Sequence, residues 1–398
     1  VACSLCCTYS CSYVLGIEVL ARGTHKIARH ATIALVTNQS GRDKRGRRTI
    51  DILLMQKFNV QHILVPEHGL DGTIPAGRLI PNSIDVPTGL PVVSLYEHNK
   101  GKKIDTSLIE SIDTIIIDLQ DSGMRHFTYI STLYMLLETA IRHNKQIIVL
   151  DRPNPLADVM EGPLVDNSCR SFVSILPIPL RHGMTMGELA LYFNKYFLNS
   201  SCNLQVIRME HYDRAKGMEN ILYKSISPNI QTIESCFGYS FLGLIGEIRP
   251  FDIGRYHNKP FQMLAVPDNG RMVPQSEWQK LATLLQRYGI RTQKVHYTNA
   301  QRKTSYTGLS IKIENISEVH AFQAILTIVE HMHALGVPVV ISPMGIKALG
   351  THELALVLEK KLPRQNFINR INKDLEQFYA KARSCFLYKP WPRIIKSS

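Results

Sequence analysis

The segment DTIIIDLQDSGMRHFTYISTLYMLLETAIRHNKQIIVLDRPNP, residues 113–155, decides the fold of this chain. It opens and closes with short runs rich in Ile and Val, and each run ends at an aspartate. Between these runs, Leu133, Leu136, Leu137 and Ile141 recur at helical spacing. The order strand, helix, strand predicts a βαβ unit in a parallel sheet that is buried on both faces.

Polar side chains follow both strands of this unit. In open α/β sheets, ligands bind beyond the carboxyl ends of the strands, so residues there are candidates for chemistry. Carboxylates, amides, a guanidinium and the phenol of Tyr129 suit a polyhydroxylated, negatively charged ligand, because an arginine can bind a carboxylate with two parallel hydrogen bonds. The structural alternative is a buried polar network that joins loops. The residues concerned are Asp118, Gln120, Asp121, Arg125, Asp151, Arg152 and Asn154.

Two upstream strands end in the same way. The run ATIALVTNQ delivers Asn38 to the sheet edge, and HILVPEHG delivers Glu67 and His68. Glu67 is our first candidate for a catalytic acid, because partial desolvation after a buried strand raises a carboxyl pKa toward values that suit protonation of a leaving group. The alternative is that Glu67 only forms an ion pair with Arg78 or Arg125.

The chain beyond this unit predicts a second domain. A Pro- and Gly-rich segment contains Arg181 and His182, and Thr185 opens a helix with a capping box. Strands and helices then alternate again. We therefore predict an α/β fold with a Rossmann-like parallel-sheet domain at 16–200, a smaller C-terminal α/β domain at 201–398, and a cleft at their junction.

Composition narrows the partners. The 398 residues carry a net charge of +13, which favours an anionic partner, with a generally basic surface as the alternative. There is no long Lys/Arg block and no basic stripe interleaved with aromatic residues, so nucleic acid is not expected as a partner. No window approaches the roughly 18 consecutive apolar residues of a membrane-spanning helix, so no integral membrane span is expected.

The N-terminal segment is excluded from the fold prediction. VACSLCCTYSC is small, apolar, uncharged and rich in cysteine, and we interpret residues 1–15 as the remnant of an export signal or a disordered end. The protein is therefore expected to be exported, either periplasmic, lipid-anchored or secreted. A metal-binding cysteine tract is the alternative.

The sequence predicts neither a metal nor another cofactor. His68, His126 and His182 lie near strand ends, but no HxH or HExxH spacing supports a metal site. There is no GxGxxG after the first strand and no P-loop motif, so a nucleotide is not expected despite the α/β pattern.

A set of motifs resembles one known family. In order they are LVTNQSG, VPEHG, GLPVVSLY, DLQDSGMRHFTYISTLYMLLE, VLDRPNP, EGPLVD, PIPLRHGMTMGELA and SPNIQT, and the likeness spans residues 16–262. This set is similar to that of the NamZ-type exo-β-N-acetylmuramidases, glycoside hydrolase family 171. The resemblance implies a Rossmann-like domain, a smaller α/β domain and a cleft between them. It also implies an exo-acting glycosidase that releases N-acetylmuramic acid from non-reducing ends of peptidoglycan fragments, with muramyl saccharides as partners.

The resemblance also assigns residues to the cleft. Glu67 matches the glutamate of the PEHG motif, the expected catalytic carboxyl, and Asp121 or Glu247 would act as base or nucleophile. Arg125 or Arg181 would bind the lactyl carboxylate of muramic acid. Alternatively, the substrate's acetamido group would be the nucleophile, with Asp121 orienting it. The implied substrate-binding positions are Asn38, His68, Gln120, Arg125, Tyr129, Asn154, Arg181, His182 and Asn229.

One segment departs from the family pattern. Where the family has EGTN and a GRGT-like turn, this chain reads GEIRPFDIGRYHNKPFQ, with Pro250 in place of the asparagine and Tyr256 in place of a glycine. The departure favours the alternative of a catalytically inactive muropeptide-binding protein. A third interpretation, a metal-dependent hydrolase of another anionic substrate, would require an activity that chelators abolish.

Overall fold

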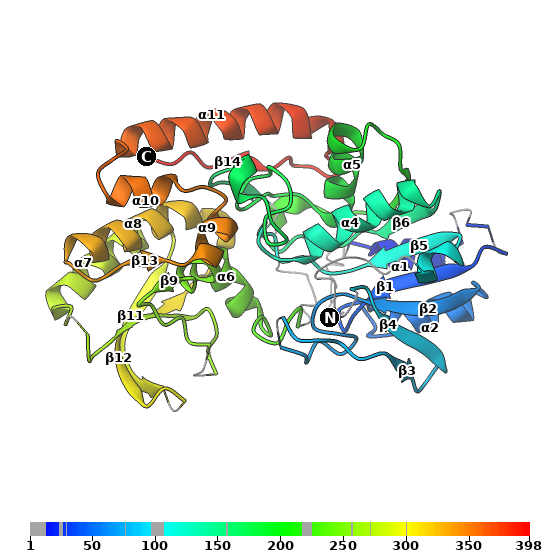
Figure 1. Cartoon of the computed structure of the whole chain (residues 1–398), viewed down its shortest axis with the longest axis horizontal. Helices are drawn as coiled ribbons and strands as arrows, with labels where there is room; N and C mark the ends of the chain where they lie inside the picture. Colours follow the sequence, from blue (N-terminus) through cyan, green and yellow to red (C-terminus); the bar gives the residue numbers. More distant parts are fainter. Residues whose placement is uncertain are drawn as a thin grey trace, which may run out of the picture.

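The computed structural model of the chain describes all residues except 1–12, 24–26, 29, 76, 97–106, 157, 217–224, 256–257, 271 and 300. The predicted export segment, apart from its last three residues, lies outside the described residues. Two α/β units lie side by side, and the long helix α11 (Arg364–Ala382) runs along the top of both (Figure 1).

A seven-stranded sheet forms the first unit. Its strands are β1 (Ile33–Thr37), β2 (Val60–Val65), β3 (Ser83–Asp85), β4 (Leu90–Ser94), β5 (Thr114–Asp118), β6 (Gln146–Leu150) and β8 (Asn203–Ile207). They follow the order β3-β4-β2-β1-β5-β6-β8, and all neighbours pair in parallel except β3, which is antiparallel to β4. The predicted α/β fold, with its parallel βαβ unit from β5 to β6, is confirmed.

Helices cover both faces of this sheet, which explains why its central strands are apolar throughout. All residues of β1 and β5 are buried. On one face, α4 (Tyr129–Arg142) and α5 (Met186–Phe197) pack against each other in the larger hydrophobic core. On the other face lie α1 (Gly16–Ala21) and α2 (Thr49–Met55). The polar residues that follow these strands are therefore held at the rim of a rigid sheet.

The sheet continues past the boundary expected at residue 200. Strand β8 pairs with β6 from Asn203, opposite Gln146, to Ile207, opposite Leu150. The run NLQVI was predicted as a strand of the second domain, but the open edge of β6 gives its backbone N–H and C=O groups hydrogen-bond partners. The first unit therefore extends through Ile207.

A small antiparallel sheet, in the order β10-β12-β11, forms the centre of the second unit. The elements of this half are α6 (Ile233–Ile245), β9 (Ile248–Arg249), β10 (Met263–Pro267), α7 (Gln275–Gln286), β11 (Arg291–Asn299), β12 (Thr304–Lys312), α8 (Ala321–Ala334), β13 (Val340–Ile341), α9 (Pro343–Leu349), α10 (Glu353–Leu358) and β14 (Arg393–Ile394). The end of the chain returns to the first half, where β14 pairs in parallel with β7 (Val159–Met160). A short helix, α3 (Ser107–Glu110), precedes β5.

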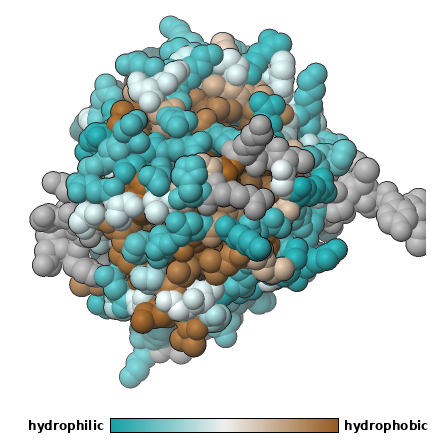
Figure 2. Space-filling view, turned by 90° about the vertical axis from the view of Figure 1, so that its right-hand side faces the viewer, coloured by the Kyte–Doolittle hydropathy of each residue, from teal (hydrophilic) through white to brown (hydrophobic). Residues whose placement is uncertain are grey.

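The face of the molecule seen in Figure 2 is mostly hydrophilic. Figure 2 looks onto the end of the molecule that holds the large sheet, and it shows an apolar area in the lower half of this face. Exposed apolar side chains near the β3 edge of the sheet include Leu79, Ile84 and Val86. Among the described residues, no helix combines the length and apolar character needed to cross a membrane.

Candidate active site

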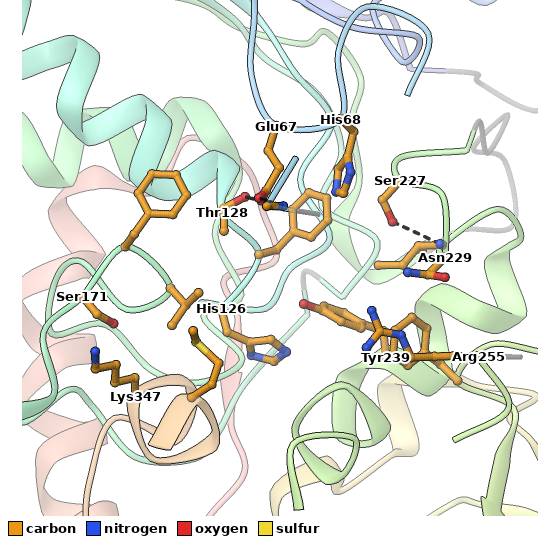
Figure 3. A pocket seen from close by; sticks show the side chains of 17 residues that line it. Glu67, His68, His126, Thr128, Ser171, Ser227, Asn229, Tyr239, Arg255 and Lys347 are labelled. Atoms are coloured by element: carbon orange, nitrogen blue, oxygen red, sulfur yellow. Dashed lines mark hydrogen bonds between the residues drawn. The ribbon is translucent and has the colours of Figure 1, made fainter. Parts of the chain in front are cut away.

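A cavity of about 590 Å³ lies between the two units. Its walls come from the residues after β2, from the loops before α4 and α6, and from α6 and α9 themselves. Figure 3 shows Glu67 and Thr128 on one side of this cavity and His126, Tyr239 and Arg255 on another. Because β2 delivers Glu67 at its carboxyl end, the cavity lies where parallel sheets bind their ligands.

Glu67 lies two residues after the end of β2, and its two carboxyl oxygens accept hydrogen bonds from different parts of the chain. Its Oε1 accepts from the backbone N–H of Gly77 at 3.1 Å, and its Oε2 accepts from the hydroxyl of Thr128 at 2.9 Å. The side chain is half-buried and lines the cavity. The carboxyl group is thus fixed in position while it faces the space that a ligand would occupy.

His68 and Asn229 line the same cavity. His68 has a φ of 80°, which is unusual for a residue with a side chain and is typical of strained functional positions. Its Nδ1 lies 2.7 Å from the carbonyl oxygen of Ile74, so Nδ1 carries the hydrogen and Nε2 remains an acceptor. Two of the predicted binding residues therefore lie beside Glu67.

Another wall holds an aromatic cluster around His126. The His126 ring centroid lies 4.8 Å from that of Tyr239, which lies 4.9 Å from that of Phe261. Burial and the neighbouring guanidinium of Arg125 lower the pKa of His126 to about 3, so the ring is neutral. Neither ring nitrogen has a hydrogen-bond partner among the described residues.

A smaller hollow of about 150 Å³ adjoins the cavity. His126 and Arg255 line both spaces. Gly243 and Glu247 line the hollow but are not among the described residues of the larger cavity. The predicted second carboxylate, Glu247, therefore lies next to the space that holds Glu67 rather than in it.

Two cationic side chains line the cavity without an internal partner. Arg255 and Lys347 are exposed, and within the described part of the chain neither forms a hydrogen bond or an ion pair. In Figure 3 they lie on different sides of the cavity. Both can bind an anionic group of a ligand.

The arginines expected to bind a substrate carboxylate lie elsewhere. Arg125 is buried, and its five N–H groups donate to the hydroxyl of Ser174 and to four backbone carbonyl oxygens. Arg181 is buried as well and forms an ion pair with Glu161 at 3.0 Å. Irregular loops leave carbonyl oxygens without strand or helix partners, and these guanidinium groups supply the missing donors. The expectation for both arginines is therefore corrected to a structural role.

Asp121 and His182 form a buried pair. The backbone N–H of Met184 donates to His182 Nδ1 at 3.2 Å, so Nε2 carries the hydrogen and donates to Asp121 Oδ2 at 3.1 Å. The N–H of Gly123 donates to the same carboxylate oxygen at 2.7 Å. Neither Asp121 nor His182 is among the described residues that line the cavity. Asp121 thus stabilises the turn at Gly123, and its predicted roles as base, nucleophile or acetamido-orienting group are corrected.

Tyr129 contacts the backbone of Glu67, and Asn38 holds the Tyr129 hydroxyl. Asn38 Nδ2 donates to the Tyr129 hydroxyl at 2.7 Å. That hydroxyl lies 3.4 Å from the backbone oxygen of Glu67 and 3.3 Å from that of Ile226. Both side chains are buried, so they position the cavity wall and do not face the ligand space as predicted.

Gln120 and Asn154 hold the loops that follow β5 and β6. Gln120 donates to two backbone carbonyl oxygens, and Asn154 donates to one. In the same region, Asp118 forms a buried ion pair with Arg152. These residues form a buried polar network that joins loops, which is the structural alternative considered for them.

Several residues of the cavity were not singled out from the sequence, among them Thr128, Tyr239 and Lys347. Thr128 lies in the polar tract before α4, two positions after His126. This spacing is the sequence feature that could have indicated that Thr128 and His126 line the same space. Tyr239 lies in the apolar helix α6, where an aromatic residue resembles part of a core. Lys347 comes from α9, and nothing in its local sequence distinguishes it from a solvated lysine.

The histidines near the strand ends have separate surroundings. His68 is bonded to Ile74, His182 is paired with Asp121, and His126 is unpartnered among the described residues. Within the described ranges, no three His, Cys, Asp or Glu side chains come together in a way that could hold a metal ion. The described cysteines are free and buried.

Comparisons with known proteins match both halves of the chain. The family model described as "Exo-beta-N-acetylmuramidase NamZ, N-terminal" matches residues 33–234, and the one described as "Exo-beta-N-acetylmuramidase NamZ, C-terminal" matches residues 237–388. A peptidoglycan beta-N-acetylmuramidase NamZ of Bacillus subtilis (strain 168) is 30% identical over 383 residues, which cover 94% of this chain and 91% of that protein.

Two solved structures from Bacteroides fragilis NCTC 9343 have a similar fold, and both are of DUF1343 family proteins. One is 29% identical, with a TM-score of 0.84 and coverage of 95% of this chain and 99% of that chain. The other is 24% identical, with a TM-score of 0.74 and coverage of 96% and 99%, and its likeness concerns the fold alone. The two-unit arrangement is thus shared over nearly all of the compared chains.

Proposed function

This chain belongs to the exo-β-N-acetylmuramidase NamZ family, and from that premise we propose that it is a glycosidase that acts on peptidoglycan. In finer detail, we propose that it releases N-acetylmuramic acid from the non-reducing ends of muramyl saccharides. The observation that carries the proposal is the carboxyl group of Glu67, which Gly77 and Thr128 hold in the wall of the cavity.

Glu67 is the general acid in this proposal. The hydrogen bonds from Gly77 and Thr128 fix the carboxyl group at the cavity wall, where its proton can pass to the glycosidic oxygen of a bound saccharide. Among the described residues that line the cavity, Glu67 is the one carboxylic acid. Among the described lining residues, Glu67 is therefore our candidate for the proton donor.

The second chemical role has two candidates, since Asp121 is buried away from the cavity. Glu247, in the adjoining hollow, would activate a water molecule, or the substrate's own acetamido group would attack the anomeric carbon. A single displacement by water inverts the anomeric configuration, whereas attack by the acetamido group followed by hydrolysis retains it. NMR spectroscopy of the freshly released sugar distinguishes these two courses.

Arg255 supports the preference for muramic acid. Muramic acid differs from glucosamine by a lactyl ether that carries a carboxylate, so a muramidase needs a cation in its binding site. Arg255 is such a cation, since it is exposed, lines the cavity and has no partner among the described residues. We propose that it takes the role that the sequence had suggested for Arg125 or Arg181.

We also propose that the protein is exported to the compartment that holds its substrate. The net charge of +13 would favour contact with an anionic cell wall. Residues 1–12, which contain most of the expected export signal, lie outside the described residues. Cell fractionation followed by N-terminal sequencing of the recovered protein tests this proposal, and recovery in the cytosol alone would contradict it.

The test of the function is turnover of a chromogenic N-acetylmuramide and of a muramic-acid-terminated disaccharide. Wild type is expected to release N-acetylmuramic acid, and Glu67→Gln to lose a factor of about 10²–10⁴ in rate. Glu234→Gln, an exposed change in the first turn of α6, is the matched control and should keep full activity. Full activity in Glu67→Gln would remove the assignment of the acid.

The competing function is a muropeptide-binding protein without catalysis. It is favoured by the altered segment from Glu247 to Phe261, which supplies residues of both the cavity and the hollow. Saturable binding of muramyl sugars by wild type, with no release of product, would establish this alternative. Turnover that persists in the presence of chelators would exclude a metal-dependent hydrolase.

A further inference from the structure

His126 is a buried polar side chain without a hydrogen-bond partner. It is 9% exposed, and neither Nδ1 nor Nε2 is bonded to any described residue. Buried polar groups in native proteins nearly always have a partner, so two unpaired nitrogens on one ring need an explanation. The ring lines both the cavity and the hollow, and Figure 3 shows it among the side chains of the cavity. A bound ligand could supply an acceptor for the imidazole N–H.

The neighbours of His126 hold its ring at this wall. The preceding residue, Arg125, is anchored by five hydrogen bonds, and the hydroxyl of Thr128 is bonded to Glu67. On the side of α6, Gly243 leaves the necessary space, because a Cβ atom there would lie 2.8 Å from His126 Nε2. The fold therefore keeps the imidazole next to the ligand space.

The chemistry of this ring selects a particular kind of ligand group. A neutral imidazole presents one N–H donor and one nitrogen acceptor, and burial keeps His126 neutral. A secondary amide presents an oxygen that accepts from the imidazole N–H, and its own N–H can donate to the carboxylate of Glu247 in the hollow. A carboxylate offers only acceptors and would lie beside the carboxylate of Glu247 in the hollow. An ammonium group offers only donors and would leave the imidazole N–H unpaired.

The hollow has the size and lining that suit a small acylated amine. Its volume of about 150 Å³, against about 590 Å³ for the cavity, gives room for a substituent rather than for a substituted sugar ring. Val173, Ile253 and Phe261 provide an apolar lining for a methyl group. Glu247 provides a carboxylate acceptor for an amide N–H.

We propose that this hollow binds the 2-acetamido group of the terminal sugar, with His126 donating to the acetamido oxygen and Glu247 accepting from its N–H. The inference rests on the proposed function, because that function places an N-acetylated sugar in the cavity. In muramic acid the neighbouring carbon, C3, carries the lactyl carboxylate. Arg255 lines both spaces and is the cation next to this subsite. One wall would thus recognise two adjacent substituents of the same ring.

Calorimetric titration of the full-length protein tests this subsite independently of turnover. The probes are N-acetylmuramic acid and muramic acid, which has a free amine in place of the acetamido group. Wild type is expected to bind the N-acetylated sugar about tenfold or more tightly than the amine, because the amine leaves buried polar groups unpaired. Equal affinity of wild type for the two sugars would overturn the inference.

Two variants act on the subsite in different ways. His126→Phe keeps a ring against Tyr239 but lacks both nitrogens, and it is expected to lose most of the preference for the N-acetylated sugar. Gly243→Ala keeps the imidazole but displaces it, and it is expected to weaken binding of N-acetylmuramic acid more than binding of muramic acid. An unchanged preference in both variants would contradict the proposal.

His331→Phe is the matched control, because it also replaces a largely buried histidine, but in α8 and outside the described lining of the cavity, where its Nε2 lies 3.6 Å from a carboxylate oxygen of Glu277. It should keep the full preference. N-acetyl-selective binding without turnover would support the subsite and reject the glycosidase. Turnover without N-acetyl selectivity would support the glycosidase and reject the subsite. Absence of binding of either sugar would also reject the subsite.

Discussion

Two sets of polar side chains lie near the carboxyl ends of the parallel strands, and they differ in their hydrogen-bond partners within the chain. In the loops, Arg125 and Arg181 are fully buried and donate to acceptors within the chain. Along the cavity, Arg255 and Lys347 are exposed, and the described residues offer neither of them a partner. His126 is buried and also unpartnered among those residues. The two sets contain similar chemical groups, so residue type does not separate them.

The number of internal partners does separate these sets. Arg125 and His126 are adjacent in the sequence, yet the first has all five donors engaged and the second has neither nitrogen bonded within the described chain. A side chain with saturated hydrogen-bonding capacity stabilises the fold, so its loss should lower the free energy of unfolding. We expect a cavity-lining side chain whose capacity is left open to bind a ligand, so its loss should lower affinity or rate instead.

The largest expected effect is on catalysis, at Glu67. Replacing this carboxyl with an amide removes the proton donor, and the rate of glycoside hydrolysis should fall by a factor of about 10²–10⁴. The amide oxygen can accept from the Gly77 N–H while the amide NH2 donates to the Thr128 hydroxyl, so the free energy of unfolding should change by less than about 1 kcal/mol. Steady-state kinetics and urea denaturation of Glu67→Gln measure the two quantities. A large loss of stability with modest loss of rate would place Glu67 in the structural set.

The next largest effect is on the free energy of unfolding, and it is tested by substituting Arg125 and Arg255. Arg125→Met should lower the free energy of unfolding by about 3–5 kcal/mol, because four carbonyl oxygens and a hydroxyl lose their donors inside the protein. Arg255→Met is the matched control at an exposed position and should change it by less than about 0.5 kcal/mol. Urea denaturation of both variants measures these changes in the free energy of unfolding. Equal losses of stability would contradict the distinction between the two sets of side chains.

A smaller effect is expected on substrate recognition. Arg255→Met should raise KM for an N-acetylmuramide about tenfold, which corresponds to roughly 1.4 kcal/mol of lost interaction with the lactyl carboxylate. Hydrolysis of the matching N-acetylglucosaminide, which has no lactyl group, should be slow in both proteins and unchanged by the substitution. An equal change for both substrates would show that Arg255 acts on the shape of the cavity rather than on the carboxylate.

The fold could be predicted from the sequence to the extent that it depends on local pattern. The apolar runs on either side of a helical repeat indicated β5, α4 and β6, and the polar ends of these strands indicated which edge of the sheet carries the site. The membership of β8 in the same sheet could not be predicted in this way. It depends on which strand edge remains open after the others have paired, and that is a property of the assembled sheet.

Residues of the candidate site could be predicted only where their position at the end of a strand determined that the side chain faces the cavity. Glu67 and His68 follow a buried strand and do line the cavity. Arg125 could not be distinguished from Arg255, because a sequence shows a guanidinium but not its acceptors. Two of the acceptors of Arg125 are carbonyl oxygens of Ala348 and Leu349, which approach it only when the second unit folds against the first.

The smallest effect, and the sharpest test of the comparison, is on the stability of His126→Phe. If the unpaired imidazole serves a ligand, the apolar ring should raise the free energy of unfolding at pH 7 by about 1 kcal/mol, since it removes a buried group that has no partner. The gain should grow in acid. Burial and Arg125 lower the pKa of His126 from 6.5 to about 3, so below pH 6.5 the unfolded chain binds a proton that the folded protein does not.

Wild type should therefore lose stability relative to His126→Phe as the pH falls from 6.5 toward 4, by up to about 1.4 kcal/mol for each pH unit. Urea denaturation of both proteins across this range gives the difference, and other titrating groups cancel because the two chains share them. A variant that is less stable than wild type at pH 7 would mean that the imidazole stabilises the fold. His126 would then belong with Arg125, and an open hydrogen-bonding capacity would no longer identify the ligand-binding side chains of this cavity.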